Sequence, residues 1–189
     1  LDGATPDQWD PVRLGRKIGY LPQILEIIPG SIRDNIARFD PEAKDKDVIA
    51  AAKLTGVHDM ILGLSEGYST QLAVPGKVSP LSGGQLQRIG LARAVFGMPA
   101  LVVLDEPNSN LDASGDRALA NAIKHAGEHG ITVVVITQKP SLLSVVDKIM
   151  LVADGNIALF GQRQQVLEQL AQRNQPGGNL PPAQNGTGR

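Results

Sequence analysis

Two adjacent acidic residues, Asp105 and Glu106, follow the aliphatic run Leu101–Leu104 and precede a turn-rich loop. The run is too short for a helix and rich in β-formers, so it predicts a buried strand. Ligands of parallel sheets bind beyond the carboxyl ends of the strands, where these carboxylates would lie. One carboxylate could hold Mg²⁺ while the other orients and deprotonates an attacking water. An ordinary strand-to-loop boundary explains the same pair equally well.

A second candidate site is the run Ser82-Gly83-Gly84. Apolar residues recur at helical spacing over 83–96, so the run predicts a helix N-terminus. Free amides and the helix dipole favour a phosphate at such a position, and glycine lets an anion approach the main chain closely. For these residues alone, a flexible turn capped by Ser82 is the simpler explanation.

The elements that must position these residues alternate between strand and helix, which is typical of a parallel α/β sheet. The expected strands are 16–23, 101–104 and 131–137, with a hairpin over 146–161 that turns at Asp154-Gly155. The expected helices are 31–37, 45–56, 58–62, 83–96, 112–129 and 165–171.

Composition excludes several classes of protein. The 18 Lys+Arg and 19 Asp+Glu residues leave a net charge of -1, so no basic surplus favours nucleic acid as a partner. The absence of cysteine excludes disulfides and thiolate metal sites. The longest apolar runs, 100–104 and 131–137, are far shorter than a membrane helix requires.

Four motifs occur in a familiar order: "YLPQ" ending at Gln23, "LSGGQ" at 81–85, "LVVLDEP" at 101–107 and "SNLD" at 109–112. Together they resemble the nucleotide-binding domain of ATP-binding-cassette (ABC) transporters. The resemblance implies a parallel sheet like that of P-loop NTPases, with a helical subdomain at about 24–97. It would make 1–173 a partial ATPase domain and 174–189 a disordered tail.

Longer stretches resemble one branch of that family. "RKIGYLPQ", "GSIRDNIARF", "AAAKLTGVHDMILGLSEGY" and "VVLDEPNSNLD" are similar to the ATPase subunit of type I secretion systems, with drug or lipid exporters as the near alternative. The resemblance implies an ATPase at the cytoplasmic face of the inner membrane. Its expected partners are the exporter's own membrane domain, a membrane-fusion adaptor and an outer-membrane channel.

The resemblance also assigns roles to residues, with ATP and Mg²⁺ as cofactors. Asp105 would hold Mg²⁺ and Glu106 would be the general base for the hydrolytic water. Gln23 would reach the metal or that water.

The remaining roles belong to a head-to-tail homodimer. Ser82, Gly83, Gly84 and Gln85 would contact the γ-phosphate of an ATP that the opposite subunit holds. Asp112 would line the interface between the subunits.

One departure from the family concerns the phosphate loop, G-x-x-x-x-G-K-[ST], which is expected upstream of Gln23. The chain has a single Gly-Lys pair, Gly76-Lys77, and that pair lacks the earlier glycine. Because only twenty-two residues precede Gln23, we expect the N-terminal strands, the phosphate loop and the membrane helices to have been cut off. The full-length protein would be an ATPase, whereas this chain alone would neither bind ATP tightly nor turn it over.

A second departure follows the strand 131–137, where the family places a histidine that bonds the γ-phosphate and this chain has Gln138. A neutral amide donates a hydrogen bond but cannot become an imidazolium, so we expect impaired hydrolysis. Gln138 could instead simply cap the strand.

Two functions therefore stay open: a segment of a transport ATPase, and a non-catalytic truncated remnant. Chromosome-maintenance ATPases share the "LSGGQ" motif, but they would need a long coiled coil between Gln23 and Ser82. Only 58 residues lie between these positions, without a sustained heptad, which excludes that class.

Overall fold

The computed structural model describes residues 5, 8–109 and 111–173. The chain forms two compact units, Leu1–Pro140 and Ser141–Arg189. Within the described ranges, no helix combines the length and the apolar character needed to cross a membrane. The tail predicted over 174–189 lies outside the described residues.

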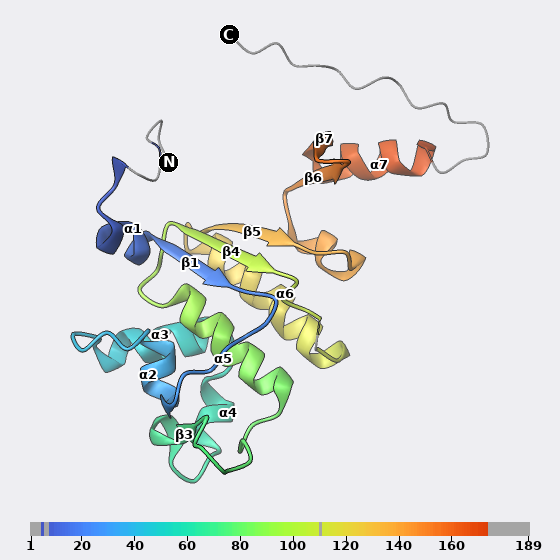
Figure 1. The fold of residues 1–189 in the computed structure, drawn as a ribbon. Coiled ribbons are helices and arrows are strands. Elements are labelled where there is room, and N and C mark those ends of the chain that lie inside the picture. The colour runs from blue at the N-terminus through green and yellow to red at the C-terminus, as the bar shows by residue number, and fades with distance from the viewer. Residues whose placement is uncertain (1–4, 6–7, 110, 174–189) are drawn as a thin grey trace. The chain divides into compact units, whose positions relative to one another are not determined.

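A three-stranded parallel sheet forms the centre of the first unit (Figure 1). Its strands are β1 (Ile18–Leu21), β4 (Leu101–Asp105) and β5 (Thr132–Ile136), in the order β1-β4-β5. Ile18 pairs with Leu101 and Leu101 with Thr132, so the three strands start level. The prediction of an α/β fold with a parallel sheet is confirmed.

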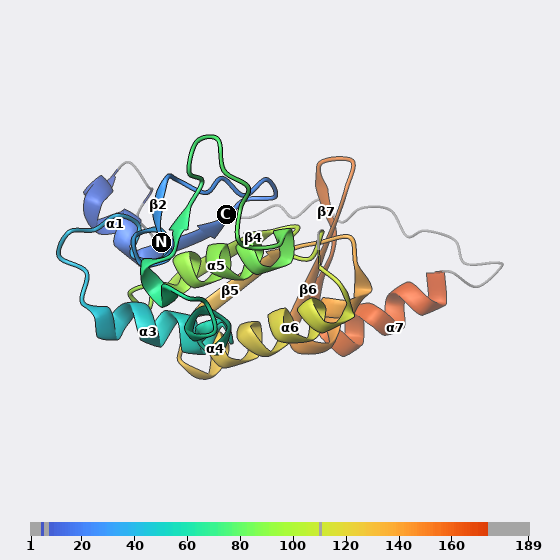
Figure 2. The same ribbon diagram turned by 90° about the horizontal axis from the view of Figure 1, so that it is seen from below.

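Two helices, α5 (Gly83–Val95) and α6 (Ala113–Glu128), cover one face of this sheet (Figures 1 and 2). The largest side chains on that face are fully buried: Leu21, Val102 and Leu104. Apolar side chains on the opposite face are exposed: Tyr20 by 53%, Val134 by 42% and Ile136 by 51%. Because all-parallel sheets are normally covered on both faces, the sheet has one apolar face that the described residues leave open.

A mainly helical segment connects β1 to α5. It contains β2 (Gly30–Ser31), α2 (Ile32–Ile36), α3 (Asp45–Leu54), α4 (His58–Leu62), the 3₁₀ helix η2 (Gly67–Ser69) and β3 (Gln71–Leu72). Its apolar side chains form a buried cluster of Ile32, Ile36, Val48, Ile61 and Leu72. The boundaries 24–97 for a helical subdomain, and the extent 1–173 of an ATPase domain, stay predictions.

The first helix, α1 (Pro11–Lys17), was not predicted. The side chain of Asp10 caps it by accepting from the Arg13 N–H at 2.8 Å, and proline suits the first helical position. The prediction of a strand over 16–23 is therefore wrong at its start, where residues 16 and 17 end this helix.

The second unit is built on an antiparallel hairpin. Strands β6 (Lys148–Ala153) and β7 (Asn156–Gln162) meet at Asp154 and Gly155, whose φ angles are 50° and 74°, so the predicted hairpin and its turn are confirmed. The 3₁₀ helix η3 (Pro140–Val145) precedes the hairpin, and α7 (Arg163–Arg173) follows it. Helix α7 is longer than the predicted 165–171.

Strand β1 packs on the last turn of α5 with no space for a side chain. A Cβ built on Gly19 would lie 1.9 Å from the carbonyl oxygen of Ala94, a main-chain atom that cannot move aside alone. Glycine is required here by space rather than by backbone conformation. The contact fixes how closely the helix approaches the strand.

We expect Gly19→Ala to destabilise the chain by about 3 kcal/mol, because the added methyl overlaps the Ala94 carbonyl. Gly15→Ala is the matched control, since nothing lies within 4 Å of its added methyl and Gly15 stands inside α1. That control should stabilise the chain by about 0.5 kcal/mol. Urea unfolding of both variants measures the two effects, and equal effects would contradict the close contact.

Candidate functional site

The acid pair lies at the carboxyl end of β4. Asp105 ends the strand and Glu106 follows it, and both residues are half-buried. The Glu106 N–H donates to the Ile136 carbonyl at 2.8 Å, so pairing with β5 continues one residue beyond the strand. Glu106 has a φ of 44°, a left-handed conformation that costs free energy in a residue other than glycine. The chain therefore makes a sharp turn at Glu106.

The parallel strands bring two more of the predicted residues to the same edge of the sheet. Gln23 stands two residues beyond the end of β1, and Gln138 two residues beyond the end of β5. Both are exposed. Because β4 lies between β1 and β5, the two glutamines flank Asp105 and Glu106.

A buried asparagine ties the loop after the acid pair to the segment after β5. The Oδ1 of Asn108 accepts from the Thr137 hydroxyl at 3.2 Å, and its main-chain oxygen accepts from Lys139 Nζ at 2.6 Å. The Lys139 N–H donates in turn to Thr137 Oγ1 at 3.0 Å. These contacts hold Gln138 and Glu106 on adjoining, mutually bonded loops. Sequence reasoning missed all three residues, although an asparagine directly after the "DEP" run was a visible signal.

Ser82 caps α5, as the sequence predicted. The Gln85 N–H donates to Ser82 Oγ at 3.3 Å, and the Ser82 N–H donates to Gln85 Oε1 at 2.8 Å, which makes a capping box. Gly83 is exposed and Gly84 half-exposed, with nothing within 4 Å of a Cβ built on Gly83. The helix start is thus pre-formed and open to an approaching group, and a phosphate contact there stays a prediction.

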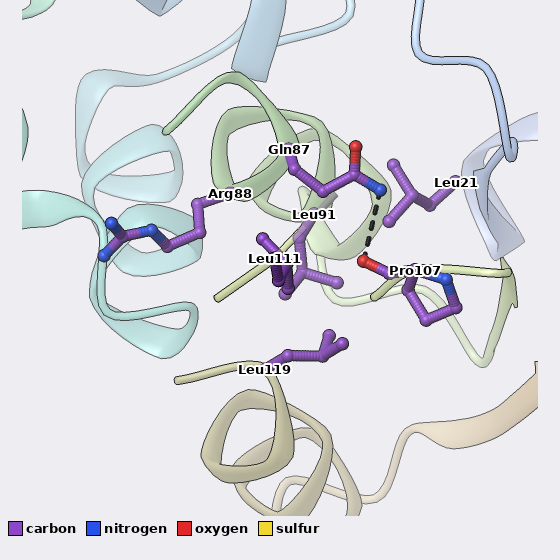
Figure 3. Close-up of a pocket in the computed structure, with 7 residues that line it drawn as sticks. All are labelled: Leu21, Gln87, Arg88, Leu91, Pro107, Leu111 and Leu119. Atoms are coloured by element: carbon purple, nitrogen blue, oxygen red, sulfur yellow. Dashed lines mark hydrogen bonds between the residues drawn. The ribbon is translucent and has the colours of Figure 1, made fainter. Parts of the chain in front are cut away.

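Helix α5 is also hydrogen-bonded to the loop that follows Asp105 and Glu106. Figure 3 shows Gln87 reaching the main chain of Pro107, whose carbonyl accepts from Nε2 at 3.2 Å. Arg88 points away from this contact. Around it lies a cavity of about 10 Å³, room for about one water molecule, lined mainly by Leu21, Leu91, Leu111 and Leu119. The cavity is a packing defect and not a ligand site.

Asp112 stands at the start of α6, where its Oδ1 accepts from the Gly115 N–H at 2.7 Å. The predicted helix cap is confirmed. Asp112 is also exposed, so a contact across a subunit interface is sterically open to it and stays a prediction.

The donor set at the strand edge suits Mg²⁺ held together with phosphate oxygens. Mg²⁺ binds one or two carboxylates and keeps its other positions for water and substrate phosphates. Asp105 and the amide of Gln23 are of the types that such a partial set requires, and their joint binding of Mg²⁺ stays a prediction. Among the described residues, no group of three His, Cys, Asp or Glu side chains is placed to hold a metal by itself.

A family model described as ABC transporter matches residues 1–109, more than half of the chain. The chain belongs to the ABC transporter family. Its sheet, capped "LSGGQ" helix and strand-end acid pair are therefore parts of that family's nucleotide-binding domain, as the sequence motifs indicated.

This ABC chain is similar to ATP-binding proteins of secretion systems. It is 48% identical to the type I secretion system ATP-binding protein PrsD of Rhizobium meliloti, over 90% of this chain and 29% of that protein. It is 38% identical to the exotoxin translocation ATP-binding protein PaxB of Pasteurella aerogenes, over 89% of this chain and 23% of that protein. The chain spans less than a third of the length of either relative.

A solved structure of a bacterial Atm1-family ABC exporter with ATP bound has a similar fold. The TM-score is 0.76 and the identity 25%, over 94% of this chain and 32% of that one. The expected resemblance to ABC exporters, with type I secretion proteins among the homologues, is confirmed.

We expect Glu106→Gly to stabilise the chain by about 1 kcal/mol, because glycine adopts the left-handed backbone at this position without strain. Glu106→Ala is the control: it removes the same carboxylate but keeps a Cβ, so it should give no such gain. Urea unfolding distinguishes them. A gain of the same size in both variants would show that the carboxylate, not the backbone, is the source.

Proposed function

We propose that this chain is the ATP-hydrolysing segment of a type I secretion exporter. The observation that carries the proposal is the shared sheet edge, where the acid pair lies between the segments that hold Gln23 and Gln138. The identity to PrsD over nearly the whole chain supports type I secretion over other exports.

In this function Asp105, with help from Gln23, would hold a Mg²⁺ ion, which when bound would neutralise charge on the phosphates. Glu106 takes the proton from the attacking water, and the left-handed backbone turns the chain at this residue. Gln138 donates a hydrogen bond toward the γ-phosphate. Because this amide carries no charge, it stabilises the transition state less than an imidazolium would.

The other half of the site comes from a second copy in a head-to-tail homodimer. The capped helix start, Ser82–Gln85, offers main-chain amides and a hydroxyl to the γ-phosphate of the ATP held by its partner. Asp112 lies in the interface between the subunits. Each nucleotide is then enclosed only when two complete subunits meet.

The surface beside Gln23 suits the exporter's membrane domain. An open groove there is lined by Pro22, Ile24, Glu26, Ile28 and Arg93. Ile24 is 80% exposed and Ile28 50%, which is unusual for large aliphatic side chains and favours a protein contact. The ATPase segment would work at the cytoplasmic face of the inner membrane. The exporter's further partners would be a membrane-fusion adaptor and an outer-membrane channel.

One alternative is a drug or lipid exporter, because the similarity is not confined to secretion proteins: the chain is also 34% identical to the ATP-binding cassette sub-family B member 6 of Mesocricetus auratus, over 89% of this chain. A second is a non-catalytic remnant, which Gln138 in place of the family's histidine favours. Identifying the cargo of the full-length exporter distinguishes type I secretion from drug or lipid export. Measuring its ATPase rate distinguishes a working ATPase from a non-catalytic remnant.

The 189-residue chain by itself should not bind ATP at micromolar concentrations, because its sequence contains no phosphate-loop motif. Titration with a fluorescent ATP analogue and Mg²⁺ measures this directly. Saturable micromolar binding that Asp105→Asn weakens would show that these residues suffice for a nucleotide site.

In the full-length exporter, Gln138→His should raise the ATPase kcat by about tenfold, because an imidazolium adds charge stabilisation in the transition state. Gln138→Asn keeps an amide and should give no gain. Glu106→Gln in the same protein should abolish turnover while ATP still binds. Full activity of Glu106→Gln would contradict the proposed general base.

A further inference from the structure

The guanidinium of Arg38 bonds to four main-chain carbonyls in three elements, α5, α1 and β1. Its Nε donates to Arg93 O at 2.9 Å and its Nη2 to Ala94 O at 2.8 Å, both in the last turn of α5. Its Nη1 donates to Gly15 O at 3.0 Å and to Ile18 O at 3.3 Å, at the junction of α1 and β1. One side chain therefore joins the end of α5 to the start of β1.

The two acceptors in α5, Arg93 O and Ala94 O, are groups that a helix leaves unsatisfied. The last four carbonyls of an α-helix lack a partner within the helix, and their dipoles favour a cation. Helix α5 ends at Val95, and Phe96 leaves it in an extended conformation. Arg38 thus caps α5 from a position 55 residues earlier in the sequence.

The position of Arg38 is costly, which indicates that the surrounding structure maintains it. Its backbone has a φ of 56°, in the left-handed region. Burial lowers the pKa of Arg38 from its ordinary value, and the like charge of Arg93 lowers it further. The dipoles of the main-chain carbonyls compensate this half-buried charge.

The same helix also holds the segment that follows Gln23. Nη1 and Nη2 of Arg93 donate to the Glu26 carbonyl at 3.0 and 3.1 Å. A Cβ built on Gly90 would lie 2.7 Å from Cδ1 of Leu25, so helix and segment are in close contact there. Together with the Gly19 contact, these interactions join α5 to both ends of the β1 segment.

We propose that Arg38 is a positioning residue, which locks α5 to β1 so that the Ser82–Gln85 helix start and Gln23 move as one body. Because Gln23 would face the nucleotide of its own subunit and Ser82–Gln85 that of the partner, Arg38 would connect the two nucleotide sites mechanically. This consequence for catalysis rests on the proposed function, whereas the lock between helix and strand does not.

Hydrogen exchange of the 189-residue chain tests the lock. Arg38→Met should speed exchange of the amides in 18–26 and in the last turn of α5 by at least about tenfold, because bonds to a charged donor are lost. Amides of α3 should keep their wild-type rates. In Arg38→Lys the exchange rates should lie between those of the wild type and Arg38→Met, since an ammonium keeps the charge but cannot bond to all four carbonyls.

The matched control is Arg33→Met in α2, the helix that ends two residues before Arg38. Arg33 bonds to the exposed carboxylate of Asp45 and to the Ala43 carbonyl, so its loss should leave α5 unchanged. Equal acceleration of α3 and α5 in Arg38→Met would show general destabilisation and overturn the lock, as would no acceleration at all.

In the full-length exporter, Arg38→Met should lower the ATPase kcat by about tenfold at unchanged KM, because Arg38 contacts no nucleotide but aligns the groups that do. Arg38→Lys should recover part of the loss. An unchanged kcat with the expected exchange pattern would overturn the catalytic role. If the wild-type exporter hydrolyses no ATP, the proposed function fails, and the exchange data alone decide whether Arg38 positions α5.

Discussion

Parallel pairing of three strands is the constraint on which the candidate site depends. Since β1, β4 and β5 start level, they also end within a residue of each other, and the side chains after them share one edge. No local feature of Asp105 or Gln138 would bring them together, because 32 residues separate them in the sequence. A shift of one residue in the register would turn every side chain of the shifted strand to the other face and dismantle the edge.

The close approach of α5 to β1 is the second determinant of the site. Gly19 removes the side chain that would hold them apart, and Arg38 adds hydrogen bonds where helix carbonyls would otherwise lack partners. Gln87 then connects α5 to the loop after the acid pair. The helix that begins with the "LSGGQ" run is thus bonded to two of the loops at the strand edge, although its own N-terminus stays open.

Local chemistry explains why much of this was predictable. The Ser82 and Asp112 caps, the Asp154-Gly155 turn and the aliphatic strand before Asp105 each carry their signal within a few residues. The sequence indicated a shared role for the acid pair and the Ser82 helix start only because their motifs follow the order of the ABC family. Helix α1 was not predicted, because its signal is only the capping residue Asp10 followed by a proline at the first helical position.

The features that escaped prediction depend on distant partners. The Arg38 cap joins residues 55 positions apart, and the Asn108 network joins loops 29 and 31 positions apart. The left-handed backbone of Glu106 likewise depends on its bond to Ile136 in a neighbouring strand. Sequence patterns of period two or near four cannot report such contacts.

The exposed amide of Gln138 bears on how the strand edge responds to pH. An amide neither gains nor loses a proton in the physiological range, whereas an imidazole titrates within it. If the proposed site uses position 138, this side chain therefore adds no ionisation of its own near neutrality, so it would contribute no pH dependence there.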